Sequence, residues 1–242
     1  MGSVSEKIAE RIKAISEDMS FGYEELPIEP DEFWSAAKAI ERLQKKGVIR
    51  KLSKGRFYKP KMTVFGEKRP DEQEILRPYL YRQGKRIAYI TGMGLYNRLN
   101  LTTQIPAVIH IASCSRRSLT GIGYLRVKPV KSYVDVSEEN YQILGFLDAL
   151  KDLRRIPDLD ISAGMTLFKS MIKALGLDQQ DQMITLALSY PPRVRALLGA
   201  ILEDIMSTPD LRQLKESLNP FTRFALGVNS TVLKTAPTWN IQ

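Results

Sequence analysis

Cysteine and histidine are nearly absent from this chain of 242 residues, which contains one of each. The single cysteine, Cys114, cannot form a disulfide within the chain, so folding does not require an oxidising compartment. No apolar run approaches the roughly 18 to 20 residues that a membrane-spanning helix needs, and the first segment has no apolar core of signal-peptide length. We therefore expect a soluble protein of the cytoplasm.

The sequence also has little of what catalysis requires. His110 lies in the apolar stretch AVIHIA without Cys or acidic residues at metal-ligand spacing, so we expect it to be packed and hydrogen-bonded rather than a ligand. Cys114 is near it in sequence, but two residues four apart on or just beyond a strand seldom form a nucleophilic pair. Asp158 and Asp160 fall between two expected helices, where a loop cap is the simpler interpretation. We therefore expect that the protein is not an enzyme and that it has no cofactor and no metal site.

Positive charge is abundant but localised. Residues 36–69 hold twelve Lys and Arg against two Glu, a net charge of +10, whereas the whole chain carries only +9. Residues 1–35 sum to −6, residues 70–135 to +6 and residues 136–242 to −1. Basic character concentrated in one segment is typical of proteins that bind the phosphate groups of nucleic acids.

The residues around this charge have the pattern of a winged helix-turn-helix. Apolar residues at steps of three and four predict a helix over 4–16, and a short or irregular second helix ends at Pro27 and Pro30. A third helix is expected over about 32–46, ending at Gly47. The alternating stretches 48–52 and 56–59 then predict a two-stranded ribbon, with Gly55 in its turn.

The third helix and the ribbon carry the candidate DNA contacts. On the helix, apolar residues share one side and polar and basic residues lie roughly opposite. A winged helix places such a helix in the major groove and its wing against the backbone. The candidates for base edges are Ser35, Lys38 and Arg42. The candidates for phosphate contacts are Lys45, Lys46, Lys51, Lys54 and Arg56, of which the last three are expected to reach outward from the ribbon. A solvated charged face, or a winged helix that binds protein, would explain the same pattern.

The rest of the chain is expected to alternate helices and strands and then to become helical. Residues 60–71 resemble a linker, because prolines and a glycine bracket a polar run. Helices are predicted over 71–83 and 94–101, and strands over 86–90, 107–112 and within 124–136. Later helices are predicted near 138–154, 163–175, 178–189, 192–206 and 209–217. A second phosphate-contacting surface and ordinary solvation are equally good interpretations of Arg82, Lys85, Arg86, Arg116 and Arg117.

These patterns predict an α+β protein with three domains. The first, residues 1–62, is a winged helix-turn-helix. The second, residues 72–136, is a small mixed α/β domain, and residues 137–242 form a helical C-terminal region.

Four stretches of the sequence together resemble a known family. The stretch AIERLQKKGVIRKLSKGRFYKPK is similar to the winged-helix start of AbiEi-type antitoxins, from bacterial type IV toxin–antitoxin and abortive-infection systems. ITGMGLYNRLNLTTQIPAVIHIA, residues 90–112, is similar to the next domain of that family. YPPRVRALLGAILE and the ending LNPFTRFALGV with TWNI resemble its AbiEi-like branch. The resemblance covers most of the chain, and the wing followed by TTQIP is its most specific part.

The resemblance implies a repressor of its own operon that also counteracts a toxin encoded beside it. Such toxins resemble nucleotidyltransferases, and the better-known antitoxins are not thought to hold them in a stable complex. One feature departs from the family: the helical region, residues 138–242, is not the basic one.

We therefore expect a DNA-binding autorepressor and antitoxin whose partners are double-stranded operator DNA, with inverted repeats, and a neighbouring nucleotidyltransferase-like toxin. The alternative is an interaction scaffold that docks and inhibits a partner toxin without sequence-specific DNA binding. A nuclease or nucleotidyltransferase is a poor interpretation, because the sequence lacks a metal-ligating acidic cluster.

Overall fold

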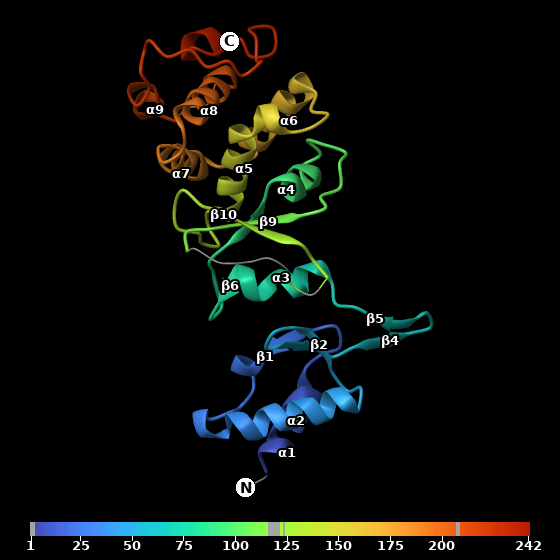
Figure 1. The fold of residues 1–242 in the computed structure, drawn as a ribbon. Helices are drawn as coiled ribbons and strands as arrows, with labels where there is room; N and C mark the ends of the chain where they lie inside the picture. Colours follow the sequence, from blue (N-terminus) through green and yellow to red (C-terminus); the bar gives the residue numbers. More distant parts are fainter. Residues whose placement is uncertain (1–2, 116–121, 123, 207–208) are drawn as a thin grey trace. The chain divides into compact units, whose positions relative to one another are not determined.

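The computed structural model of the chain describes residues 3–115, 122, 124–206 and 209–242 (Figure 1). Helices and several small sheets alternate along the chain, and its C-terminal region is helical. The expected mixed α+β class is confirmed. The chain divides into two compact units. The N-terminal unit comprises Met1–Tyr81 with Thr120–Arg126, and the C-terminal unit comprises Arg82–Leu119 with Val127–Gln242.

Two helices and a three-stranded sheet share the first hydrophobic core of the N-terminal unit. Ser3 and Glu6 begin the first helix with a reciprocal capping box. The strands pair antiparallel in the order β1-β3-β2, and Phe21, Ile40 and Phe57 are among the side chains buried between sheet and helices. In chain order the elements are α1 (Val4–Ala14), β1 (Ser20–Gly22), the 3-10 turns η1 (Tyr23–Glu25) and η2 (Pro30–Glu32), α2 (Phe33–Lys45), β2 (Arg50–Ser53) and β3 (Arg56–Tyr58).

A second hairpin follows in the stretch that the sequence suggested was a linker. Strands β4 (Lys61–Thr63) and β5 (Gly66–Lys68) pair antiparallel, and α3 (Glu72–Leu80) comes after them. The linker prediction is therefore wrong for residues 61–68. Its Pro60 and Pro70 lie outside the paired residues, where a missing N–H does not interrupt the ladder.

The C-terminal unit begins with a small mixed sheet of order β10-β9-β8, in which β9 is parallel to β10 and antiparallel to β8. Gly92, at a φ of +68°, links β8 to the short helix α4 that follows. The elements are β6 (Tyr81–Arg82), which starts at the boundary of the units, β7 (Lys85–Arg86), β8 (Tyr89–Thr91), α4 (Met93–Arg98), β9 (Ile109–Ser113) and β10 (Val127–Lys131).

Helix α8 lies at the centre of the helical region (Figure 1). It contacts α5, α6, α7, α9 and η4, and a run of its residues from Ala196 to Leu202 is buried. Because this helix is apolar on nearly all sides, it requires neighbours all round. The elements are α5 (Tyr141–Lys151), η3 (Leu153–Arg155), α6 (Ile161–Lys173), α7 (Leu177–Ala187), α8 (Pro192–Asp204), α9 (Arg212–Glu216) and η4 (Ala236–Trp239). Asp160 caps α6 by accepting a hydrogen bond from the Ala163 N–H, as expected of a loop cap.

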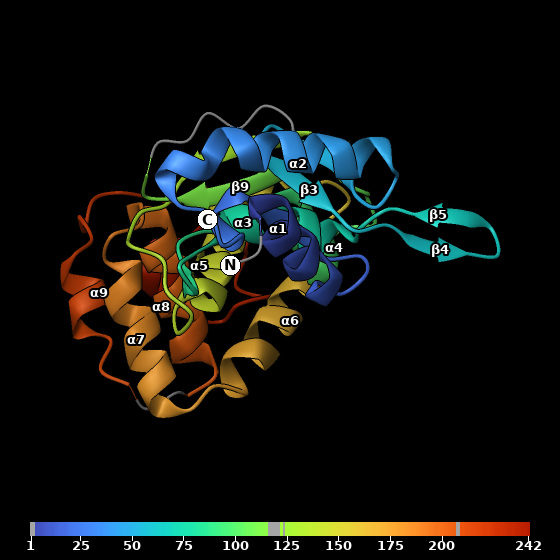
Figure 2. The same cartoon turned by 90° about the horizontal axis from the view of Figure 1, so that it is seen from below.

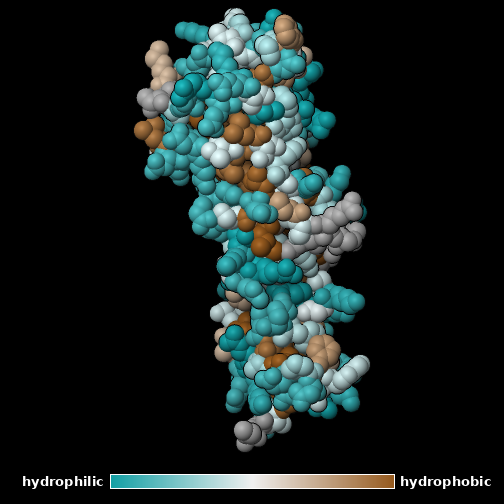
Figure 3. Space-filling model, turned by 90° about the vertical axis from the view of Figure 1, so that its left-hand side faces the viewer, coloured by the Kyte–Doolittle hydropathy of each residue, from teal (hydrophilic) through white to brown (hydrophobic). Residues whose placement is uncertain are grey.

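Among the residues that the structure describes, no helix is long and apolar enough to cross a bilayer. The face of the molecule in Figure 3 is mostly hydrophilic, and its hydrophobic patches are small and separated by polar side chains.

Candidate nucleic-acid interface

Helix α2 presents one apolar and one basic side. Ala36, Ala39 and Ile40 are buried in the core of the N-terminal unit. Basic residues in the last turn, Arg42 and Lys45, interact favourably with the negative end of the helix dipole. The residues predicted to contact DNA from this helix and the residue after it are all exposed: Ser35, Lys38, Arg42, Lys45 and Lys46.

Most of these cations are available to a ligand. Lys45 forms an exposed ion pair with Glu41 at 2.8 Å, and this contact holds the pKa of the Glu41 carboxyl below its usual value. An exposed pair of this kind contributes little stability, so a phosphate group can displace it at small cost. Within the described residues, no carboxylate oxygen lies within 4.0 Å of the charged nitrogens of Lys38, Arg42 and Lys46.

The β2–β3 ribbon follows α2 directly. Gly47, at a φ of +74°, ends the helix, and Gly55 supplies the same φ in the turn of the ribbon. Arg50 pairs with Tyr58 and Lys51 with Phe57 across the two strands. Lys51 and Lys54 are exposed, as predicted.

Arg56 does not reach outward, and the expectation that it does is wrong. Its side chain is 10% exposed and forms ion pairs with Glu24 and with Glu25, the latter at 3.3 Å. The reason is its position on β3, the central strand of the sheet, where all three residues are buried. Its charge is already paired, so we do not count it among the phosphate contacts.

The second predicted phosphate surface is only partly described. Arg82 and Lys85 are exposed. Arg86 is 10% exposed, forms an ion pair with Glu138 at 2.8 Å and places its guanidinium 3.6 Å from the centre of the Tyr141 ring. A cation packed in this way stabilises the fold and is not free for phosphate. The predicted residues Arg116 and Arg117 lie outside the described residues.

Two exposed apolar features of the N-terminal unit were missed by sequence reasoning. Trp34, in the first turn of α2, is 79% exposed. Val64 and Phe65 form the tip of the β4–β5 hairpin and are 95% and 98% exposed. No turn motif marks the hairpin in the sequence, because Val64-Phe65 is not one of the dipeptides that favour a two-residue turn.

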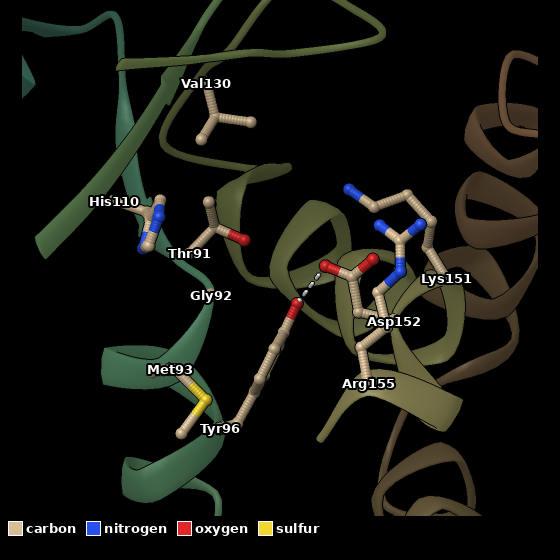
Figure 4. A pocket seen from close by; sticks show the side chains of 9 residues that line it. All are labelled: Thr91, Gly92, Met93, Tyr96, His110, Val130, Lys151, Asp152 and Arg155. Atoms are coloured by element: carbon tan, nitrogen blue, oxygen red, sulfur yellow. Dashed lines mark hydrogen bonds between the residues drawn. The ribbon is translucent and has the colours of Figure 1, made fainter. Parts of the chain in front are cut away.

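The C-terminal unit has a small pocket of about 190 Å³ (Figure 4). The Tyr96 hydroxyl donates to the Asp152 carboxylate at 2.8 Å inside it. Lys151 forms an ion pair at 2.7 Å with the buried Asp148, which also accepts a hydrogen bond from Thr91 at 2.7 Å. The lining residues come from β8, α4, β9, β10, the end of α5 and η3: Thr91, Gly92, Met93, Tyr96, His110, Val130, Lys151, Asp152 and Arg155.

His110 is half-buried in this pocket, and its Nδ1 has no hydrogen-bond partner in the described part of the chain. The expected hydrogen bond is therefore not made at this nitrogen. Burial, and secondarily Lys128, lower the pKa of His110. Cys114 is close to the Ser132 carbonyl, and burial and Asp135 raise the pKa of its thiol, which is opposite to the shift that activates a nucleophilic cysteine. Among the described residues, no cluster of His, Cys, Asp or Glu is placed to hold a metal.

The sequence profile of DUF6088, described as a family of unknown function, matches residues 7–153. The chain belongs to this family. The match covers α2, both hairpins of the N-terminal unit and the pocket as far as Asp152. This DUF6088 chain matches no curated protein.

Among solved structures, the chain is similar to the crystal structure of RV2827C protein from Mycobacterium tuberculosis. The two sequences are 14% identical, the TM-score is 0.44, and the similarity covers 93% of this DUF6088 chain and 85% of the other.

Proposed function

We propose that this protein is a DNA-binding transcriptional autorepressor and the antitoxin of a toxin–antitoxin operon. The observation that carries the DNA-binding part is the exposed face of α2. Lys38 and Arg42 stand on it without carboxylate partners among the described residues, next to the exposed lysines of the β2–β3 ribbon. The antitoxin part rests on the resemblance of the sequence to AbiEi-type antitoxins.

The order of elements supports interpreting the N-terminal unit as a winged helix. Two α-helices and two short 3-10 turns precede a hairpin, and the short strand β1, which follows α1, pairs with the return strand β3. In this interpretation α2 is the recognition helix and the β2–β3 ribbon is the wing. Both then present cations to one duplex.

The proposed contacts are of two kinds. Ser35, Lys38 and Arg42 lie on the helix face and would read base edges in the major groove, where Arg pairs best with guanine. Lys45, Lys46, Lys51 and Lys54 would bind phosphates, fixing the position of the protein without reading sequence. The operator is double-stranded DNA, with inverted repeats for two copies of the chain.

The two kinds of contact predict different effects of single substitutions. Arg42→Ala is expected to weaken operator binding by about 5- to 150-fold and to relax discrimination at one base position. Lys54→Ala should weaken binding to all sequences alike and reduce the slope of log affinity against log salt by about 1. Fluorescence anisotropy with operator and mismatched duplexes measures both.

The matched control is Lys173→Ala, which removes an exposed cation from the C-terminal unit. It should leave affinity and salt slope as they are in the unmodified protein. If Arg42→Ala and Lys54→Ala behave like this control, the face of α2 is not a DNA-binding surface.

The second candidate function is a scaffold that docks and inhibits a partner toxin without reading DNA. Trp34 favours it, because exposed tryptophans are common at the energetic centres of protein interfaces. A neighbouring gene for a nucleotidyltransferase-like toxin is expected under both proposals. Two results together would favour the scaffold. The unmodified protein would co-purify with that toxin but not bind operator DNA, and Trp34→Ala would no longer co-purify with the toxin.

A further inference from the structure

The β4–β5 hairpin (Lys61–Lys68) extends away from α2 (Figure 2). Its tip carries two apolar residues. Lys61 pairs with Lys68, Met62 with Glu67 and Thr63 with Gly66, which leaves Val64 and Phe65 as the turn. All residues of the hairpin are exposed, and its tip is almost fully so. Because Val64 and Phe65 are adjacent in the turn, they form one exposed apolar surface that a ligand can cover.

The turn holds the tip in one conformation. The Thr63 hydroxyl donates to the Gly66 carbonyl at 2.9 Å and accepts from the Phe65 N–H at 3.2 Å. Gly66 has a φ of +104°, which a residue with a side chain adopts only under strain. The apolar pair is therefore presented by a built turn, and little conformational entropy is lost when it binds.

The base of the hairpin is fixed to the rest of the N-terminal unit. Glu67 accepts a hydrogen bond from Tyr58 at 2.9 Å and forms an ion pair with Arg50 at 3.0 Å. Lys68 forms an ion pair with Asp18 at 3.0 Å, and that contact raises the pKa of Lys68. Because these partners lie on or beside the β1-β3-β2 sheet, the hairpin keeps a defined relation to the β2–β3 ribbon.

Charge around the hairpin favours an anionic partner. Lys61, on its first strand, is exposed and has no carboxylate oxygen within 4.0 Å among the described residues. The carboxylate of Glu67 is occupied by Arg50, so the hairpin does not present a free negative charge. A duplex combines an anionic backbone with base steps that an apolar wedge can enter from the minor groove.

We propose that Phe65, backed by Val64, inserts as a wedge between two base pairs in the minor groove and kinks the duplex that α2 binds. Lys61 contacts the adjacent phosphate. The inference rests on the proposed DNA-binding function and adds a second, deformation-dependent element of recognition to it. Sequences with flexible pyrimidine–purine steps at the insertion site are then preferred without hydrogen bonds to their bases.

The test separates binding from deformation. Anisotropy with the DNA that precedes the gene reports binding, permanganate reactivity of thymines reports unstacking, and energy transfer between the duplex ends reports bending. The unmodified protein should create a hyperreactive thymine and a kink in the range of about 20–90°. Phe65→Ala should abolish both signals and weaken binding about tenfold, through loss of one stacked aromatic ring.

Two variants control the interpretation. Phe65→Leu keeps an apolar wedge and should retain the kink. Phe221→Ala removes another phenylalanine, 91% exposed in the C-terminal unit, and should behave like the unmodified protein. If the protein binds DNA without unstacking or bending it, or if Phe65→Ala bends DNA normally, the wedge is refuted while DNA binding stands. If the protein does not bind DNA at all, both the wedge and the proposed DNA-binding function are refuted. If Phe65→Ala loses a protein partner and leaves the DNA geometry unchanged, the hairpin tip is a protein-docking surface.

Discussion

Two arginines of the basic segment, Arg42 and Arg56, have opposite environments. Arg42 is exposed on α2, whereas Arg56 is buried on β3 and forms ion pairs with two glutamates of the 3-10 turn η1. The carboxylates of Glu24 and Glu25 largely neutralise Arg56, so it ties η1 to the sheet. Charge counted along the sequence therefore overstates the charge available to DNA by at least this residue.

Arg56→Ala is expected to destabilise the N-terminal unit. The free energy of unfolding should fall by about 1–3 kcal/mol, because two ion pairs and buried contacts of the side chain are lost. Urea unfolding measures this. Lys54→Ala, on the same ribbon but exposed, should change stability by no more than about 0.5 kcal/mol. Equal stability of the two variants would show that Arg56 has no structural role.

At the scale of elements, α8 depends on a glycine for its packing. A Cβ added at Gly199 would overlap the ring of Trp239, a buried side chain of η4 whose indole N–H donates to Glu203. Helix propensity alone favours alanine over glycine by about 1 kcal/mol. Close packing of the Trp239 ring against the helix backbone predicts instead that alanine at position 199 destabilises the protein.

We expect Gly199→Ala to lower the free energy of unfolding by about 1–3 kcal/mol, the usual effect of overpacking a core. Gly176→Ala is the matched control, since a Cβ there meets no atom within 4 Å and φ is −68°. Because Gly176 is the N-cap of α7, where alanine is less favourable than glycine, this substitution should lower the free energy of unfolding by less than about 1 kcal/mol in thermal unfolding. Stabilisation by Gly199→Ala would contradict the packing of Trp239 on α8.

Helices were largely predictable from the sequence, because periodic burial is a local signal. Helices expected over 4–16, 32–46 and 192–206 are observed at Val4–Ala14, Phe33–Lys45 and Pro192–Asp204. The exposure of the basic face of α2 was predictable for the same reason. Contacts between residues distant in sequence were not predictable from it.

The corrections to Arg56 and to the linker both depend on contacts outside the local segment. Glu24 lies 32 positions before Arg56, and only the fold brings them together. The hairpin at residues 61–68 is held by Arg50, Tyr58 and Asp18, so its own residues do not distinguish it from a linker. The pocket of the C-terminal unit is likewise assembled from β8, β9, β10 and α5, and no single motif predicted it.

At the scale of the whole molecule, each unit has its own hydrophobic core, and the core of the C-terminal unit contains three tyrosines. The hydroxyls of Tyr89 and Tyr96 donate to Asp148 and Asp152, each at 2.8 Å, and that of Tyr190 donates to the Leu144 carbonyl at 3.2 Å. Burial, and secondarily the neighbouring carboxylates, raise the pKa of all three well above the ordinary value of 10.0.

These tyrosines predict a loss of stability at high pH. Above pH 10.0 the unfolded chain releases the three protons while the folded chain keeps them, so stability falls as pH rises. Each tyrosine should contribute about 1.4 kcal/mol per pH unit to the loss. Urea unfolding from about pH 9 to pH 11.5 measures the slope. Tyr96→Phe should reduce the slope of the free energy of unfolding against pH by about a third. Tyrosinate absorbance from these residues in the folded protein near pH 10.5 would contradict the prediction.

The most direct test of the account is fluorescence anisotropy of the whole protein across a salt series. One duplex carries the DNA that precedes the gene, and the other carries the same bases scrambled. We predict tighter binding to the first, with log affinity falling against log salt at a slope of about −3 to −4 for the lysines Lys45, Lys46, Lys51 and Lys54. Equal and weak binding to both duplexes would contradict the account, and would leave a basic surface whose partner is another protein.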